Sequence, residues 1–237
     1  MNQVIGSPSN RSPRMKTKAD TATKLKAPVH AADRPPGFFE GTEMPIADWW
    51  KALWPDPARV LAKVGMKPGM DVIDLCCGDG WFTLHIAGLA RRVIAIDVDP
   101  ALLEVARRRL SESKLNNCAF VTGNAYDIRR LCPRPVDFVF LANVFHGVPD
   151  KPRLARAIHD VLKPTGLLAI VNWHRLPREE TIVLGEPRGP RTELRMSPAQ
   201  TFGSVEPSLK RSDFVELPPY HYGAVFKRPD ESADTLK

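Results

Sequence analysis

Three absences limit what this sequence of 237 residues can be. A helix needs about 18 apolar residues in succession to cross a bilayer, and the longest apolar runs, such as residues 167–171, are far shorter. The basic residues near the N-terminus are not followed by the apolar stretch of a secretory signal. The four cysteines form no CxxC pair and no zinc-binding spacing. We therefore expect no membrane span, no metal site and free thiols in the cytoplasm.

Positive charge is concentrated at one end of the chain. The formal net charge is +7, from 34 basic and 27 acidic residues. Residues 1–35 contain seven of the basic and two of the acidic residues, which leaves 27 basic and 25 acidic residues for the rest. A nucleic-acid-binding domain usually carries a basic stripe on its folded body. The nearly neutral body therefore argues against a specific nucleic-acid partner.

Composition also divides the chain into segments. Residues 1–40 are rich in Ser, Thr, Pro, Lys and Ala without apolar periodicity, which predicts a disordered basic tail. Residues 41–230 have the length of one globular domain. We expect the last residues, 231–237, to be disordered as well.

Strand and helix patterns alternate through the predicted domain. Seven apolar strands are expected at 71–75, 92–96, 119–121, 136–141, 167–171, 214–217 and 222–226, with helices at 47–54, 58–64, 81–90, 100–110, 126–131 and 151–162. Strands without polar alternation are typical of a parallel sheet that helices cover on both faces. Only four residues join the last two strands, too few for a parallel crossover. The sequence therefore predicts an α/β fold with a doubly wound, mostly parallel seven-stranded sheet and an antiparallel C-terminal strand.

Two acids and a glycine turn indicate a nucleoside-containing cofactor. The first strand includes Asp74 and leads into a turn with Gly78 and Gly80, where the backbone can approach a ligand closely. The second strand ends at Asp97, an acid suited to accept hydrogen bonds from ribose hydroxyls. The third glycine of a dinucleotide fingerprint is replaced by Thr83. A carboxylate before the turn disfavours a pyrophosphate and favours a cationic ligand such as S-adenosylmethionine.

These residues resemble a known family. The segment 74–80 resembles the acidic glycine-loop motif of class I S-adenosylmethionine-dependent methyltransferases, and Asp97 resembles their ribose-binding acid. Residues 123–127 resemble the segment that contacts adenine, and 143–150 resemble the segment after the fourth strand in the methyltransferase type 11 branch. The resemblance covers roughly residues 45–228 and implies a Rossmann-like fold and an enzyme of class EC 2.1.1.

Carried over residue by residue, the resemblance implies a set of cofactor contacts. They are Asp74, Cys76, Gly78, Gly80, Asp97, Val98, Asn124, Ala125, Tyr126 and Asn143. Cys76 departs from the family pattern, because it stands where the family has its first glycine. A cysteine does not adopt a positive φ cheaply, so we expect an altered turn there.

The resemblance also implies in-line transfer of a methyl group to a small-molecule acceptor. Such a reaction requires mainly alignment of the acceptor, and a general base only where the acceptor must lose a proton. His146, after the fourth strand, and His174, after the fifth, are the candidate catalytic residues. Each has packing within its turn as the alternative role. Tyr220, His221 and Tyr222 are expected to shape the last turn.

Other features and other functions stay open at this point. The tryptophans at 49, 50 and 54 suit a lid over the site or packing against the sheet. The loop at 186–191 carries two arginines that suit an anion clamp or a solvated loop. The alternative functions are an NAD-dependent oxidoreductase and a non-catalytic nucleoside-binding or interaction protein on the same fold.

Overall fold

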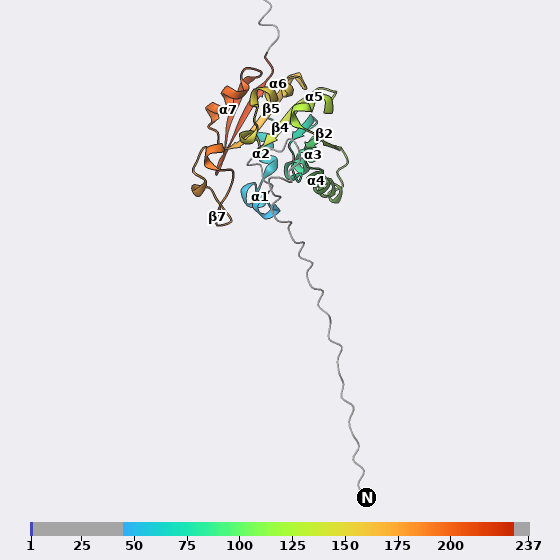
Figure 1. The fold of residues 1–237 in the computed structure, drawn as a ribbon. Coiled ribbons are helices and arrows are strands. Elements are labelled where there is room, and N and C mark those ends of the chain that lie inside the picture. Colours follow the sequence, from blue (N-terminus) through green and yellow to red (C-terminus); the bar gives the residue numbers. More distant parts are fainter. Residues whose placement is uncertain (2–44, 230–237) are drawn as a thin grey trace, which may run out of the picture. The chain divides into compact units, whose positions relative to one another are not determined.

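A seven-stranded sheet forms the centre of the computed structural model, which describes Met1 and residues 45–229 (Figure 1). The strands are β1 (Asp71–Leu75), β2 (Arg92–Asp97), β3 (Cys118–Thr122), β4 (Val136–Ala142), β5 (Leu162–Trp173), β8 (Lys210–Leu217) and β9 (His221–Lys227). They lie in the order β3-β2-β1-β4-β5-β9-β8. All neighbours pair in parallel except β9, which runs antiparallel to both β5 and β8. The predicted fold class is confirmed, with β9 as its antiparallel strand.

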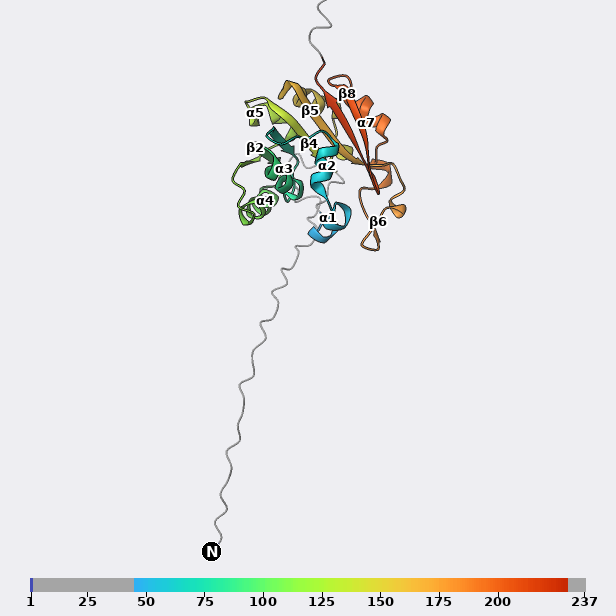
Figure 2. The same ribbon diagram turned by 180° about the vertical axis from the view of Figure 1, so that it is seen from behind.

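Helices cover both faces of this sheet (Figures 1 and 2). They are α1 (Ala47–Leu53), α2 (Pro57–Lys63), α3 (Trp81–Leu89), α4 (Pro100–Glu112), α5 (Ile128–Leu131), α6 (Lys151–His159) and α7 (Pro198–Val205). One core cluster joins the sheet to residues of α1 to α4, and a second joins it to residues of α5 to α7. Because both faces are covered, β1 is buried at all five of its positions.

The helix starts follow the expected chemistry. Asp56 and Asp99 cap α2 and α4, each with a proline at the first helical position. Ser197 caps α7 in a capping box, in which its hydroxyl accepts from Gln200 and the Gln200 side chain accepts from the backbone N–H of Ser197.

The predicted helix at 151–162 is wrong at its C-terminal end. The helix α6 ends at His159, and Leu162 already belongs to β5. The backbone N–H of Val136 donates to Val161, and Lys163 forms an ion pair of 2.8 Å with Asp137. Through these contacts with the start of β4, residues 162–166, which lie between the predicted helix core and the predicted strand at 167–171, are part of β5.

The segment 175–196, which includes the loop predicted at 186–191, contains regular structure and side-chain hydrogen bonds. It contains the short hairpin of β6 (Ile182–Val183) and β7 (Glu186–Pro187). The guanidinium of Arg195 is buried within it and donates hydrogen bonds to four acceptors along the segment: the carbonyls of Leu176, Arg188 and Pro190 and the hydroxyl of Thr181. We call this segment the arginine-centred loop. Its hairpin and α1 lie at the same end of the sheet in both views (Figures 1 and 2).

The tail predicted at 1–40 and the C-terminus predicted at 231–237 lie outside the described residues, Met1 excepted. Over residues 45–229, no helix has the length and apolar character needed to cross a bilayer.

Candidate cofactor and acceptor site

The glycine turn after β1 is fixed by hydrogen bonds to the end of β2. The N–H of Cys77 donates to the carbonyl of Ile96, and the N–H of Gly78 donates to the Asp97 carboxylate at 2.8 Å. Gly78 and Gly80 both have positive φ, at 56° and 78°. A Cβ on Gly80 would lie 2.6 Å from the Cβ of Ala106, so this glycine also lets α3 approach α4.

Cys76 adopts the left-handed conformation that the family's glycine would adopt. Its φ is 58°, so the expected alteration of the turn is not found. A side chain in this region costs roughly 1–2 kcal/mol, which the contacts of the turn must offset. Burial and the nearby carboxylates of Asp74 and Asp97 raise the pKa of the Cys76 and Cys77 thiols well above the usual value. Both thiols are therefore neutral and poor nucleophiles.

Two buried carboxylates border the turn without a cationic partner among residues 45–229. Asp74 is 3% exposed and accepts a hydrogen bond of 2.6 Å from the Thr83 hydroxyl. Asp97 is 8% exposed and accepts from the backbone N–H groups of Gly78 and Asp99. Burial raises the pKa of Asp74 to about 7 and also raises the pKa of Asp97. This end of the sheet is therefore complementary to a cationic ligand and unfavourable for a diphosphate.

A third buried acid in the turn has a structural role that the sequence did not reveal. Asp79 forms an ion pair of 2.8 Å with Arg109 of α4 and accepts from the N–H of Trp81. This pairing ties the turn to α4. Thr83 was likewise missed as a partner of Asp74. Its only signal was its place where a dinucleotide fingerprint has glycine.

The residues after β3 lie beside the end of β2, as the adenine assignment requires. The N–H of Gly123 donates to the backbone carbonyl of Asp97, and Val98 lies half-buried next to it. The side-chain oxygen of Asn124 accepts from the N–H of Tyr126 and so caps a short helix that begins at Ala125, which is buried. The side chain of Tyr126 accepts a hydrogen bond from the N–H of Asp150 at the start of α6.

Asn143, directly after β4, carries the clearest sign of a missing partner. Its φ is 61°, and its backbone N–H donates to Val171. Both polar atoms of its side-chain amide are buried without a hydrogen-bond partner. An unmet buried polar group costs about 1–3 kcal/mol, so this amide is suited to bind a ligand at the end of β4.

The two candidate catalytic histidines have different surroundings. His146 is 5% exposed in a short turn at residues 145–147, close after Asn143. His174 has its Nε2 2.9 Å from the carboxylate of Glu216 on β8, which turns the ring toward the far edge of the sheet. His146 therefore lies in a buried turn three residues after Asn143, whereas the ring of His174 faces Glu216 on the edge strand. Their catalytic roles stay predictions.

An aromatic cluster covers the ends of β5 and β9. The ring centroid of Trp173 lies 6.0 Å from that of Trp49 and 4.1 Å from that of His221, and the ring of Trp54 packs at a tilt against His221, with 4.5 Å between the centroids. His221 is fully buried, neither of its ring nitrogens has a hydrogen-bond partner, and burial lowers its pKa well below the usual value. Trp50 is also buried. The tryptophans thus pack against the sheet.

Trp173 also supports the arginine-centred loop. The guanidinium of Arg195 lies 5.1 Å from its ring centroid, and Tyr220 stacks on it at 6.0 Å. A Cβ on Gly189 would come within 2.9 Å of the indole. The two arginines at 188 and 191 therefore belong to a loop that is folded onto the sheet. No group of three or more His, Cys, Asp or Glu side chains that could hold a metal ion is found between residues 45 and 229.

Part of the domain matches a known family, and its fold matches a solved structure. Residues 72–166 match the family described as "Methyltransferase domain". The crystal structure of an S-adenosylmethionine-dependent methyltransferase from Aquifex aeolicus has the same fold, with a TM-score of 0.66 and 24% identity over 78% of this chain and 94% of that one. Residues 72–166 thus match a methyltransferase domain in sequence, and the chain shares its fold with the Aquifex aeolicus methyltransferase.

Two curated relatives are similar over part of the chain. The 2-phytyl-1,4-naphtoquinone methyltransferase of Nostoc sp. is 32% identical over 52% of this chain and 54% of its own length. The ubiquinone biosynthesis O-methyltransferase of Xanthomonas campestris pv. campestris is 32% identical over 54% of this chain and 57% of its own length. The chain thus spans about half the length of the curated relatives that it matches.

Proposed function

We propose that this protein transfers a methyl group from S-adenosylmethionine to a small-molecule acceptor. The observation that carries the proposal is the pair of buried carboxylates, Asp74 and Asp97, that lie beside the glycine turn of a methyltransferase domain without a cationic partner in residues 45–229. When bound, S-adenosylmethionine supplies a methyl group activated by a positively charged sulfur. It also carries an ammonium group and ribose hydroxyls, and no phosphate.

Five of the predicted residues have a direct part in holding this cofactor. Asp74 lies on the side suited to the ammonium group, while Thr83 holds its carboxylate in place. Each oxygen of Asp97 accepts one backbone hydrogen bond and keeps a lone pair for a ribose hydroxyl. The amide of Asn143 gains the partner that it lacks. Ala125 and Tyr126 border the adenine.

The rest of the chemistry is alignment and the exclusion of water. An acceptor held in line with the methyl group reacts without covalent help from the protein. The buried aromatic cluster at the end of β5 and the start of β9 would exclude water from that end of the sheet. His146, next to Asn143, is placed to take a proton from an acceptor that must lose one, and His174 is the less direct candidate.

The oxidoreductase alternative is not favoured. A dinucleotide would bring a diphosphate against Asp74 and Asp97, and the glycine pattern is incomplete at Thr83. The two curated relatives named above carry quinones in their names, so quinols and phenols are the first acceptor class to test. We also propose that the protein acts in the cytoplasm, where its four free cysteines would stay reduced, and without a specific nucleic-acid partner.

Calorimetric titration with S-adenosylmethionine, S-adenosylhomocysteine and NAD tests the cofactor. We expect the two sulfur nucleosides to bind and NAD not to bind. Methyl transfer from isotopically labelled S-adenosylmethionine to a panel of quinols, phenols and amines then tests the activity. Heat with NAD alone would overturn the proposal. Binding of the sulfur nucleosides without transfer to any acceptor would favour the non-catalytic alternative.

A further inference from the structure

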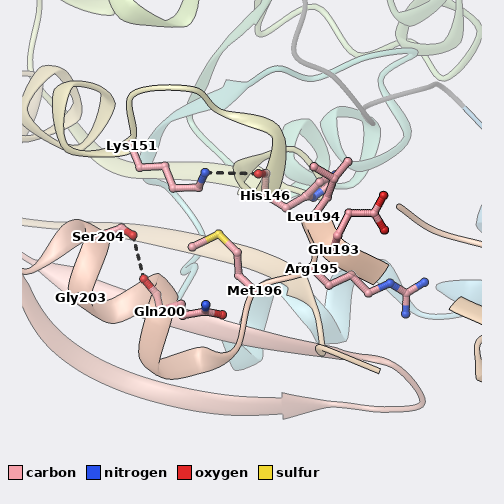
Figure 3. Close-up of a pocket in the computed structure, with 9 residues that line it drawn as sticks. All are labelled: His146, Lys151, Glu193, Leu194, Arg195, Met196, Gln200, Gly203 and Ser204. Carbon is pink, nitrogen blue, oxygen red and sulfur yellow. Dashed lines mark hydrogen bonds between the residues drawn. The ribbon is translucent and has the colours of Figure 1, made fainter. Parts of the chain in front are cut away.

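A cavity of about 420 Å³ lies between the start of α6 and the helix α7 (Figure 3). Nine residues line it: His146, Lys151, Glu193, Leu194, Arg195, Met196, Gln200, Gly203 and Ser204. Its volume is within the range of small-molecule sites in proteins, about 300–1,000 Å³. We call it the α6–α7 cavity.

Lys151 is a cation in this cavity without a counter-ion. Its ammonium group donates to the backbone carbonyls of Val148, at 2.8 Å, and His146, at 3.3 Å. No carboxylate within residues 45–229 pairs with it, and burial alone lowers its pKa. An ammonium group has three donors, and the carbonyls use two of them. One donor is thus available to a ligand, and the charge has the ring of Phe145, 5.8 Å away, but no carboxylate as its partner.

The neighbouring residues of the cavity supply a further hydrogen-bond donor and apolar surface. Together they suit an anionic ligand that also has an apolar part. The side-chain oxygen of Gln200 accepts from the N–H of Ser197, which leaves the amide NH₂ of Gln200 as a donor. Figure 3 shows Lys151 on one wall of the cavity, with Gln200 and Ser204 on the opposite wall and the thioether of Met196 between them. Leu194 adds apolar surface. The acid in the lining, Glu193, is exposed and pairs with Arg191.

The cavity shares its wall with the cofactor side of the domain. One of the two carbonyls that Lys151 binds belongs to His146, in the turn that follows Asn143 at the end of β4. Asp150, the residue before Lys151, donates its N–H to Tyr126 in the predicted adenine segment. A molecule in the cavity therefore lies against the same turn that carries the candidate base.

We propose that the α6–α7 cavity is the binding site of the methyl acceptor and that this acceptor is an amphipathic acid whose carboxylate pairs with Lys151. The inference rests on the proposed function and narrows its acceptor to a class of chemistry. The carboxylate supplies the counter-ion that the protein does not, and the apolar part of the acceptor contacts Met196 and Leu194. Lys151 is then a specificity-determining residue and takes no part in the chemistry.

Binding of carboxylate probes to the full chain with S-adenosylhomocysteine present tests the inference. The probes are 4-hydroxybenzoate, 4-hydroxycinnamate and 4-hydroxyphenylacetate, each compared with its neutral alcohol. We expect at least one acid to bind and its alcohol to bind at least tenfold more weakly. In Lys151→Met the affinity for the acid should fall about tenfold or more, as expected for the loss of a charge-assisted hydrogen bond. Lys151→Arg should retain the preference.

A second variant fills the cavity without touching Lys151. A Cβ on Gly203 meets no atom within 4 Å, so Gly203→Leu places a side chain in the cavity and should abolish binding of the acid. Gly88 of α3 is also a helical glycine with no atom near an added Cβ, which makes Gly88→Leu the matched control. Gly88→Leu should bind the acid as the unchanged protein does.

The outcomes separate this inference from the proposed function. Normal binding of S-adenosylhomocysteine with no binding of any acid, or with equal binding of acid and alcohol, overturns the inference and leaves the function standing. Binding of the acid that survives both Lys151→Met and Gly203→Leu overturns it too. Acid binding that these variants remove, in a protein that does not bind S-adenosylhomocysteine, supports the site and contradicts the function.

Discussion

The hydroxyl of Thr83 donates a 2.6 Å hydrogen bond to the buried carboxylate of Asp74, and no positive side chain in residues 45–229 shares that carboxylate. The first turn of α3 is thereby tied to the strand before the glycine turn. The hydrogen bond favours the ionised form, but burial disfavours it more strongly, and the pKa of Asp74 rises to about 7. This carboxyl group is therefore poised to change its charge near neutral pH.

The first prediction concerns the stability of the ligand-free protein. The folded state holds the Asp74 proton more tightly than the unfolded state. The contribution of protonated Asp74 to the free energy of unfolding therefore falls as the pH rises from about 4 to about 7. Asp74→Asn has no carboxyl group to ionise, so its stability does not fall in this way as the pH rises. We expect it to stabilise the protein at pH 8 by up to about 4 kcal/mol, on the scale of 1.36 kcal/mol per pKa unit, and to change little at pH 4. Thermal unfolding of both proteins measures the difference. An equal effect at both pH values would contradict the assignment.

A second prediction concerns cofactor binding through the same group. A cationic ligand favours ionised Asp74, so binding below pH 7 should release a proton. We expect the affinity for S-adenosylmethionine to rise from pH 5.5 to pH 8 and to lose most of this dependence in Asp74→Asn. Calorimetry in two buffers of different ionisation enthalpy measures the proton release. A pH-independent affinity in the unchanged protein would show that Asp74 does not contact the positive charge.

Asp97→Ala is expected to weaken cofactor binding by about 1 kcal/mol or more, the scale of a lost hydrogen bond to a charged acceptor. Since Asp97 also accepts from the N–H groups of Gly78 and Asp99, the melting temperature should fall as well. Glu104→Ala on the exposed face of α4 is the control and should change neither quantity. Unchanged affinity in a folded Asp97→Ala protein would remove the ribose assignment.

The left-handed conformation of Cys76 predicts an unusual stabilising substitution. Cys76→Gly removes the steric cost of a side chain at φ 58°. Cys76→Ala removes the thiol but keeps the Cβ, so it is the matched comparison. We expect the glycine variant to exceed the alanine variant in unfolding free energy by about 1 kcal/mol. Denaturant unfolding measures both, and an alanine variant of equal stability would mean that the turn relaxes around the side chain.

Arg195 is predicted to hold the arginine-centred loop together. Its planar guanidinium binds acceptors that are spread from Leu176 to Pro190. Lysine has neither the number nor the geometry of these donors. In Arg195→Lys we expect amide hydrogen exchange to increase throughout residues 176–190 while the strands stay protected. Protection of the loop equal to that of the unchanged protein would show that the hairpin folds without the guanidinium.

Much of the fold could be predicted from local sequence patterns. The nearly continuous apolar run at 136–141 and the apolar run at 167–171 became β4 and β5, and aspartate–proline pairs stand at the starts of α2 and α4. The start of β5 was missed because Lys163 to Gly166 has the composition of a helix stop. Its extended conformation depends on Asp137, 26 residues earlier in the chain. A local pattern does not contain such a contact.

The candidate site, too, could be predicted only in part from local sequence. The glycine turn, Asp74 and Asp97 were predicted because their spacing along the chain reflects the carboxyl ends of two neighbouring parallel strands, β1 and β2. The sequence analysis did not predict that Lys151 lines the α6–α7 cavity without a counter-ion. Lys151 follows a capping aspartate and has the sequence of an ordinary helix start. Its lack of a counter-ion depends on what packs around it.

Trp173 links three segments that are distant in the sequence. Its indole contacts Trp49 of α1, His221 of β9 and Arg195 of the arginine-centred loop. A shift of any one of them changes the surface on which the other two rest. Because α1, β9 and the arginine-centred loop all pack on this one ring at the end of β5, a substitution in one of them should alter the packing of the other two.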